Sequence, residues 1–225
     1  MVGAVIVAAG KSERMGAGVD KAFLSLGGRP VLAWSLLAFE KCPEINRVVV
    51  VVRKERVESA IGLVRMFGLS KVAKVVAGGA TRQASVLLGL EALGDDVLLV
   101  AVHDGSRPCV TPELIAKTVQ SAKRSGSGVA AVKVVDTLKE VEHGTLVART
   151  VDRSKLWAVQ TPQTFYCKAL RKAYLALDKR LAAMTDEASL IERSGEAVHL
   201  VPSSWANIKI TFSEDLAVAA AILKV

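Results

Sequence analysis

A loop of small residues directly after the first apolar segment is the strongest local sign of chemistry in this sequence. The loop reads AAGKSERMG at residues 8–16, and Lys21 follows a few residues later. Small residues let backbone N–H groups approach a phosphate chain, and Arg14 and Lys21 supply positive charge where a polyanion would lie. The glycine spacing fits neither a Walker A loop nor a dinucleotide fingerprint. We therefore expect a nucleoside triphosphate site of another kind, with an ordinary βα loop as the alternative.

Asp104 is a second sign of a ligand site, because it follows an apolar segment that is expected to be a central strand. Sheets of α/β proteins place ligand contacts at the carboxyl ends of their strands. Its neighbour His103 has no evident acid–base partner and is interpreted as a hydrogen-bonded structural residue. Arg82 could pair with a carboxylate on a helix, and Lys209 could be a solvated lysine at a strand end. The histidines are isolated, and the cysteine and histidine spacing fits no zinc site.

Apolar segments alternate with helix signals along the first half of the chain. The segments are rich in β-branched residues without a polar alternation, which is typical of parallel strands covered on both faces. They lie at residues 2–7, 48–52, 72–77 and 97–102. Pro30, Thr81 and Thr111 provide start signals for intervening helices. We expect these helices at residues 31–39, 81–93 and 111–123. This alternation predicts a Rossmann-like α/β fold, with a mostly parallel sheet, helices on both faces and right-handed crossovers.

Residues 136–157 change the pattern, because they form short, polar, charge-rich pieces around a turn at Gly144. We predict a projecting β-arm. A two-stranded ribbon is barely stable alone, so the arm is expected to pack on a second subunit, and a homodimer follows as a hypothesis. The rest of the chain is expected to form helices at 166–177 and 186–194, a strand at 197–201 and a helix at 213–223. We predict a single domain over residues 1–225 that carries this arm.

Composition narrows the class of protein. The chain has 225 residues, of which 51% are hydrophobic, so it can bury one sizeable core. The net charge of +8 is spread along the sequence and aromatic residues make up only 4%, which disfavours a nucleic-acid platform. A polyphosphate ligand explains the charge, with a solvated basic surface as the alternative. No apolar run reaches the roughly 20 residues needed to cross a bilayer. No leader is evident, and the three scattered cysteines suit a reduced cytoplasm.

The first loop and Lys21 resemble the signature of sugar-phosphate nucleotidyltransferases. Further motifs are similar to those of the 2-C-methyl-D-erythritol 4-phosphate cytidylyltransferase family, occur in the same order and span nearly the whole chain. They read GGATRQAS at 78–85, VHDGSRP at 102–108, TVDR at 150–153, QTPQ at 160–163, TDEA at 185–188 and NIK at 207–209. Each motif is weak alone, but together they are specific. The resemblance implies a cytoplasmic homodimer of the non-mevalonate isoprenoid pathway that transfers CMP from CTP to methylerythritol phosphate, releasing pyrophosphate with Mg²⁺.

The resemblance also implies a role for each matching residue. Arg14 and Lys21 would embrace the triphosphate, with Lys21 at the α-phosphate, and Lys209 would be a catalytic cation on the side of the second substrate. Asp104 would lie near the ribose and the metal, which the triphosphate itself would carry. The other nucleotide-binding residues would be Ala8, Ala9, Gly10, Gly79, Ala80 and Ser85. The second substrate would meet Arg107, Thr161 and Thr185, together with Thr137 and Arg153 on the arm of the partner subunit.

The residues fit this chemistry on their own terms. A phosphate monoester has a second pKa of about 6, so its attacking oxygen is mostly ionised at cellular pH and needs no strong general base. An in-line displacement between two anions requires positioning and charge neutralisation instead. Arg14, Lys21, Arg107, Arg153 and Lys209 could supply this charge together with Mg²⁺.

Three positions depart from the family pattern. Asp20 replaces the usual Pro before Lys21, Ala80 replaces a common Asp beside the base, and Ala206 replaces a common Asp before the NIK motif. Ala80 weakens a side-chain account of base selection, and with Asp20 in place of Pro the family pattern does not fix the path of the first loop.

Other functions stay open at this point. Ribitol 5-phosphate cytidylyltransferases and molybdenum-cofactor nucleotidyltransferases share the first loop. Ala9, where guanine-using relatives typically have Gly, and the NIK motif argue against the latter. A non-catalytic nucleotide-binding or nucleic-acid-binding protein is disfavoured, because both Lys21 and Lys209 are present.

Overall fold

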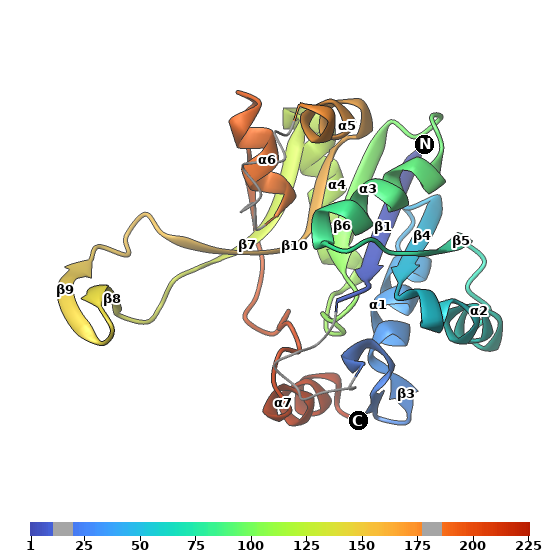
Figure 1. The fold of residues 1–225 in the computed structure, drawn as a ribbon, viewed down its shortest axis with the longest axis horizontal. Coiled ribbons are helices and arrows are strands. Elements are labelled where there is room, and N and C mark those ends of the chain that lie inside the picture. Colours follow the sequence, from blue (N-terminus) through green and yellow to red (C-terminus); the bar gives the residue numbers. More distant parts are fainter. Residues whose placement is uncertain (11–19, 177–185) are drawn as a thin grey trace.

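A seven-stranded sheet forms the centre of the computed structural model, which describes residues 1–10, 20–176 and 186–225 (Figure 1). Its strands lie in the order β11-β7-β10-β6-β1-β4-β5. Neighbouring strands are parallel except where β10 pairs with β6 and β7. The bounds are β1 (Val2–Ala8), β4 (Arg47–Val52), β5 (Val72–Ala77), β6 (Leu99–Asp104), β7 (Ser127–Lys133), β10 (Trp157–Tyr166) and β11 (Leu200–Pro202). The predicted mostly parallel α/β sheet is confirmed.

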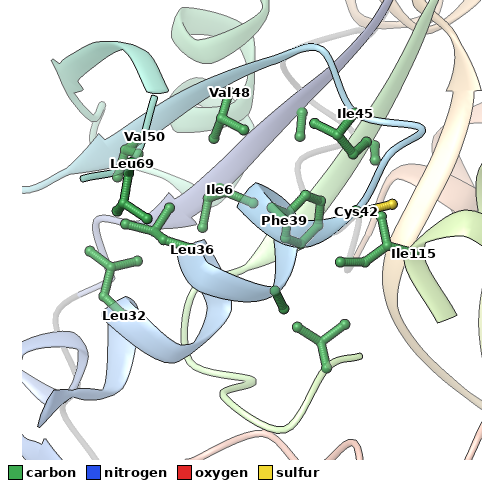
Figure 2. Close-up of a cluster of buried hydrophobic side chains, with 14 of the residues drawn as sticks. Ile6, Leu32, Leu36, Phe39, Cys42, Ile45, Val48, Val50, Leu69 and Ile115 are labelled. Carbon is green, nitrogen blue, oxygen red and sulfur yellow. The ribbon is translucent and has the colours of Figure 1, made fainter. Parts of the chain in front are cut away.

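Helices cover both faces of the sheet, so successive residues of the central strands are buried on opposite sides. Ile6 of β1 belongs to a core with helices α1, α2 and α4, whereas Val5 belongs to a second core with α3, α5 and α6. Figure 2 shows the first core, where Leu36 and Phe39 of α1 lie near Ile6 and Val50. The helices span α1 (Val31–Lys41), α2 (Val57–Met66), α3 (Arg82–Leu93), α4 (Pro112–Ser125), α5 (Cys167–Leu175) and α6 (Glu187–Arg193).

The helix start signals act as the sequence predicts. The Thr81 side chain accepts a hydrogen bond from the Ala84 N–H and caps α3, and Thr111 caps α4 in the same way through the Leu114 N–H. Such caps satisfy an otherwise unpaired N–H group and contribute about 1 kcal/mol each. The cap at Thr81 matters for the site, because it fixes the point where the chain leaves β5 and enters α3.

A two-stranded arm projects far from the body of the molecule (Figure 1). Its strands are β8 (Leu138–His143) and β9 (Leu146–Val151), joined by a turn in which Gly144 has a φ of +55°. Nearly all of its side chains are exposed, including the apolar Val141, Leu146 and Val147. The prediction of a projecting hairpin within residues 136–157 is confirmed, although its last residue already belongs to β10.

Several elements were not predicted from the sequence. Among them are α2 and β10, the antiparallel strand between β6 and β7. Proline is normally confined to edge strands and irregular positions, so Pro162 is unusual in a strand between two others. The structure accommodates it where the pairing of β10 with β7 shifts register between Val159 and Gln163.

The C-terminal elements follow the predictions more loosely. The strand predicted at 197–201 is β11, which begins three residues later, and the predicted last helix is α7 (Glu214–Leu223). Part of the helix predicted at 166–177 lies outside the described residues. Short elements complete the fold, namely η2 (Lys21–Phe23), β2 (Ser25–Leu26), β3 (Arg29–Pro30) and η3 (Lys54–Arg56). Among the helices described, none is long and apolar enough to span a membrane.

Candidate active site

A cavity of about 590 Å³ opens at the carboxyl ends of β1, β4, β5 and β6, where α/β sheets place their ligands. The structure brings together around it all the residues predicted to bind the nucleotide, along with Lys21 and Lys209, the two described lysines that were predicted to be catalytic. The lining includes Ala8, Ala9, Gly10, Gly79, Ala80, Ser85, Asp104, Lys21 and Lys209. The predicted site residues Arg14 and Thr185 lie outside the described residues.

One wall of the cavity is made of backbone, because side chains would collide there. A Cβ atom on Gly78 would lie 2.4 Å from the Cβ of Ala9, and a Cβ on Gly79 would lie 2.6 Å from a side chain of α3. The Ser85 hydroxyl accepts a hydrogen bond from the Gly79 N–H at 3.1 Å and donates one to the Thr81 carbonyl at 2.9 Å. These bonds hold the loop after β5 in a shape that lets a ligand approach peptide groups closely.

Asp104 is the centre of a charge cluster at the floor of the cavity. Its Oδ2 lies 2.7 Å from Nζ of Lys209, its Oδ1 lies 3.2 Å from Nε of Arg82, and Nε of Arg107 is 4.0 Å away. Burial alone would raise the pKa of this carboxyl group, but the positive charges of Arg82 and Lys209 hold it well below its usual range. Asp104 is therefore a carboxylate at neutral pH, and it fixes the ammonium group of Lys209 inside the cavity.

Arg82 links this cluster to helix α6. Its guanidinium donates to both carboxylate oxygens of Glu187, at 2.7 and 2.9 Å, and Tyr174 donates its hydroxyl hydrogen to the same carboxylate at 2.9 Å. Burial lowers the pKa of Arg82, but the charges of Glu187 and Asp104 more than compensate and raise it overall. The predicted pairing of Arg82 with a carboxylate on a helix is confirmed. Its additional contact with Asp104 was not predicted.

The segment before α7 carries Lys209 to the cavity through backbone contacts. The Arg107 guanidinium donates to the Asn207 carbonyl at 2.7 Å, and the Ile210 N–H donates to the Ser106 carbonyl at 2.8 Å. The Asn207 side chain donates in turn to Gln160 at 2.9 Å and to the Thr161 carbonyl at 3.0 Å. Lys209 is therefore not a solvated strand-end lysine. Its position is set by β10 and by the loop after β6.

Thr161 and His103 lie directly behind Asp104. The Thr161 hydroxyl accepts a hydrogen bond from the Asp104 N–H at 3.0 Å and lies 3.0 Å from Nδ1 of His103. Burial lowers the pKa of His103 to about 3, against the opposing effect of Asp104. His103 is thus neutral and fully buried, as its interpretation as a structural residue requires. Thr161 and Arg107 adjoin the cavity through these contacts, and their roles toward a second substrate stay predictions.

The arm residues Thr137 and Arg153 are separated from this cluster. Both are exposed; Thr137 directly precedes β8, and Arg153 follows two residues after the end of β9. The prediction that they serve a second substrate requires a site on another subunit.

The described part of the chain offers no ready-made metal cage. Within it, no three side chains of His, Cys, Asp or Glu gather closely enough to hold a metal ion. The acidic residues of the cavity lining are Asp20, Glu55 and Asp104, and all three are already paired with cations. A metal ion would therefore need most of its ligands from a bound phosphate chain.

The fold and the site together define a Rossmann-like α/β protein with a cationic cavity suited to a phosphorylated ligand. A sequence model of the family described as 2-C-methyl-D-erythritol 4-phosphate cytidylyltransferase matches residues 2–225, and the chain belongs to this family. The resemblance inferred from the motifs is thereby confirmed.

Individual relatives agree over almost their full length. A protein described as 2-C-methyl-D-erythritol 4-phosphate cytidylyltransferase from Dehalococcoides mccartyi is 45% identical over 223 residues, covering 99% of this chain and 96% of the relative. One of the same description from Alkaliphilus metalliredigens is 42% identical, covering 97% and 91%. The crystal structure of 4-diphosphocytidyl-2C-methyl-D-erythritol synthase from Anaerococcus prevotii superposes with a TM-score of 0.85 at 32% identity, covering 100% of this chain and 96% of that one.

Proposed function

We propose that this protein transfers CMP from CTP to 2-C-methyl-D-erythritol 4-phosphate and releases pyrophosphate, as a step in non-mevalonate isoprenoid biosynthesis. One observation carries the proposal: the family match covers residues 2–225, and the described nucleotide-binding residues of the family motifs all line one cavity. In this proposal both substrates are small anions. Binding them accounts for the positive net charge without a nucleic-acid or membrane partner. A cytoplasmic location accords with the three free cysteines.

The nucleotide occupies the side of the cavity between β1 and α3. Ala8, Ala9, Gly10 and the loop with Gly79 and Ala80 contact the base mainly through backbone groups. Ser85 acts by holding that loop, since its hydroxyl is already engaged by Gly79 and Thr81. Arg14 and Lys21 hold the triphosphate, and Lys21 neutralises the α-phosphate as the charge on it develops.

The acceptor phosphate lies on the side of Lys209, where Arg107 and Thr161 adjoin the cavity, and the family motif assigns Thr185 to the same substrate. One of its oxygens attacks the α-phosphorus of CTP in line with the bond to the departing pyrophosphate. No protein base is needed, because the attacking oxygen is mostly ionised near neutral pH. This agrees with the position of His103, because the ring is fully buried and its lowered pKa makes it a poor proton acceptor near neutral pH. The work of the protein is to hold two repelling anions close together.

Mg²⁺ fits this site as a companion of the triphosphate. Mg²⁺ is commonly bound by one or two carboxylates together with substrate phosphates. Asp104 lines the cavity, but its oxygens already contact Lys209 and Arg82, so it would lie near the ion while the triphosphate carries it. The ion would supply neutralisation of the phosphate charge.

The arms make the protein a homodimer in this proposal. An exposed hairpin with apolar Val141, Leu146 and Val147 needs a surface to cover it. A two-fold pairing would exchange the arms, so that Thr137 and Arg153 of each subunit contact the methylerythritol phosphate bound by its partner.

Pyrophosphate release tests the proposal, with each of the four nucleoside triphosphates assayed against methylerythritol phosphate and ribitol 5-phosphate. We expect turnover with CTP and methylerythritol phosphate far above all other pairs, because the closely packed wall at Ala9 and Gly79 suits a pyrimidine better than a purine. UTP is the most demanding comparison, since it differs only at the base edge beside Ala80. Equal rates with GTP, or a preference for ribitol phosphate, would overturn the assignment.

A further inference from the structure

Asp20 occupies a junction on the rim of the cavity, and its side chain is only 2% exposed. Oδ1 accepts a hydrogen bond from the Ala22 N–H at 3.3 Å and so caps η2, the short helix that begins with Lys21. Oδ2 accepts a hydrogen bond from Nη2 of Arg53 at 2.8 Å and lies 3.3 Å from Nε of Arg56. The carboxylate thus ties η2 to the turn that follows β4.

The other end of η2 is held by the same turn. The guanidinium of Arg56 lies over the ring of Phe23, 5.2 Å from its centroid. Arg56 therefore contacts both Asp20, before η2, and Phe23, its last residue, and Lys21 lies between these two contacts.

We propose that Asp20 is a positioning residue for Lys21: with Arg53 and Arg56 it fixes η2 so that the lysine is held at the α-phosphate of the nucleotide. The proposal rests on the proposed function. A carboxylate beside a triphosphate would repel it, so Asp20 is unsuited to bind the nucleotide itself. Its pairing with two arginines removes that repulsion and leaves the rim cationic. Asp20 stands where the family usually has Pro, so this chain uses an ionic clamp where ring rigidity would otherwise restrict the backbone.

The substitution Asp20→Asn tests the clamp, because it keeps the shape and the cap acceptor but removes the ion pairs. A displacement of 1 Å can cost 10²-fold in rate, and a loosened η2 should move Lys21 by less, so we expect kcat to fall roughly tenfold. The KM for CTP should change less than kcat. In a Lys21→Ala background the same substitution should change kcat by less than about twofold, because Asp20 acts through Lys21.

Matched variants separate positioning from general damage. Asp96→Asn removes another Arg–Asp pair, the contact with Arg47 far from the cavity, and should leave kcat unchanged. Arg56→Gln loosens both ends of η2 from a half-exposed position, and it decides the question if Asp20→Asn does not fold. It should lower kcat in the wild-type background and have little effect in the Lys21→Ala background.

A measurement that omits methylerythritol phosphate tests the positioning of Lys21 independently of the proposed reaction. Reductive methylation followed by mass spectrometry measures how strongly CTP protects the Lys21 amine. We expect strong protection in the wild type and clearly weaker protection in Asp20→Asn. Equal protection, an unchanged kcat, or equal losses of kcat with and without Lys21 would overturn the positioning role. Absence of turnover with methylerythritol phosphate in the wild type would count against the proposed function only.

Discussion

Glu187→Gln tests whether the buried ion network behind the cavity holds the site together. The carboxylate of Glu187 is 1% exposed and accepts two hydrogen bonds from Arg82 and one from Tyr174. The glutamine keeps the shape but leaves Arg82 with Asp104 as its remaining anionic partner. Breaking a buried ion pair on one side typically costs about 3–5 kcal/mol. Because Asp104 still compensates and the amide retains one acceptor, we expect a loss of about 2–3 kcal/mol in the free energy of unfolding.

Urea unfolding of the wild type and the variant measures this loss. Tyr174→Phe is the matched control, because it removes a single hydrogen bond from the same carboxylate and should cost about 1 kcal/mol. The kcat of Glu187→Gln should also fall. Asp104 is then the remaining carboxylate partner of Arg82, so Arg82 competes with Lys209 for it and shifts the lysine in the cavity. A loss below about 0.5 kcal/mol, the range of ordinary surface substitutions, would refute the reasoning.

Three further predictions address the reaction and its pH dependence. Lys21→Ala should lower kcat by about 10²–10³-fold while KM for CTP rises less, and a near-normal kcat would reduce Lys21 to a ground-state anchor. Refolding an equal mixture of Lys21→Ala and Arg153→Ala should restore about a quarter of wild-type activity, because about half the dimers are mixed and each has one intact site. Recovery no higher than that of the separate mutants, in verified mixed dimers, would exclude exchanged arms. The lowered pKa of His103 means that its contribution to stability is present above about pH 6.5 and decreases as the pH falls toward 3. Its contribution should fall by about 2 kcal/mol at pH 5. Unfolding midpoints of the wild type and His103→Gln that shift equally between pH 7 and pH 5 would contradict this.

The sequence predicted the parallel strands well, because strands buried on both faces leave continuous apolar segments. The same rule could not find β10, since Pro162 interrupts its apolar pattern. This segment is a strand because it pairs with β6 and β7 on either side. The helix caps at Thr81 and Thr111 were predicted because capping is local. The arm was recognised from its polarity, but which surface covers it is not a local property of the chain.

Contacts between residues far apart in the sequence limited how much of the site could be predicted. Asp104 and Lys209 were singled out separately, yet their contact joins residues far apart in the sequence. Glu187 was not predicted as the partner of Arg82, although both lie in family motifs, GGATRQAS and TDEA. Asp20 was noted only as a departure from the family, because its arginine partners lie on a different turn. The pairing of buried charges is decided by tertiary packing, and sequence spacing carries little information about it.

The identity of the product tests the central claim most directly, because pyrophosphate release alone could also come from hydrolysis of CTP. Mass spectrometry and ³¹P NMR of a reaction with CTP, methylerythritol phosphate and Mg²⁺ should show one diphosphate linking cytidine to methylerythritol, formed in equal amount to pyrophosphate and largely lost in Lys21→Ala. Accumulation of free CMP, or a linked product that persists unchanged in Lys21→Ala, would contradict the account.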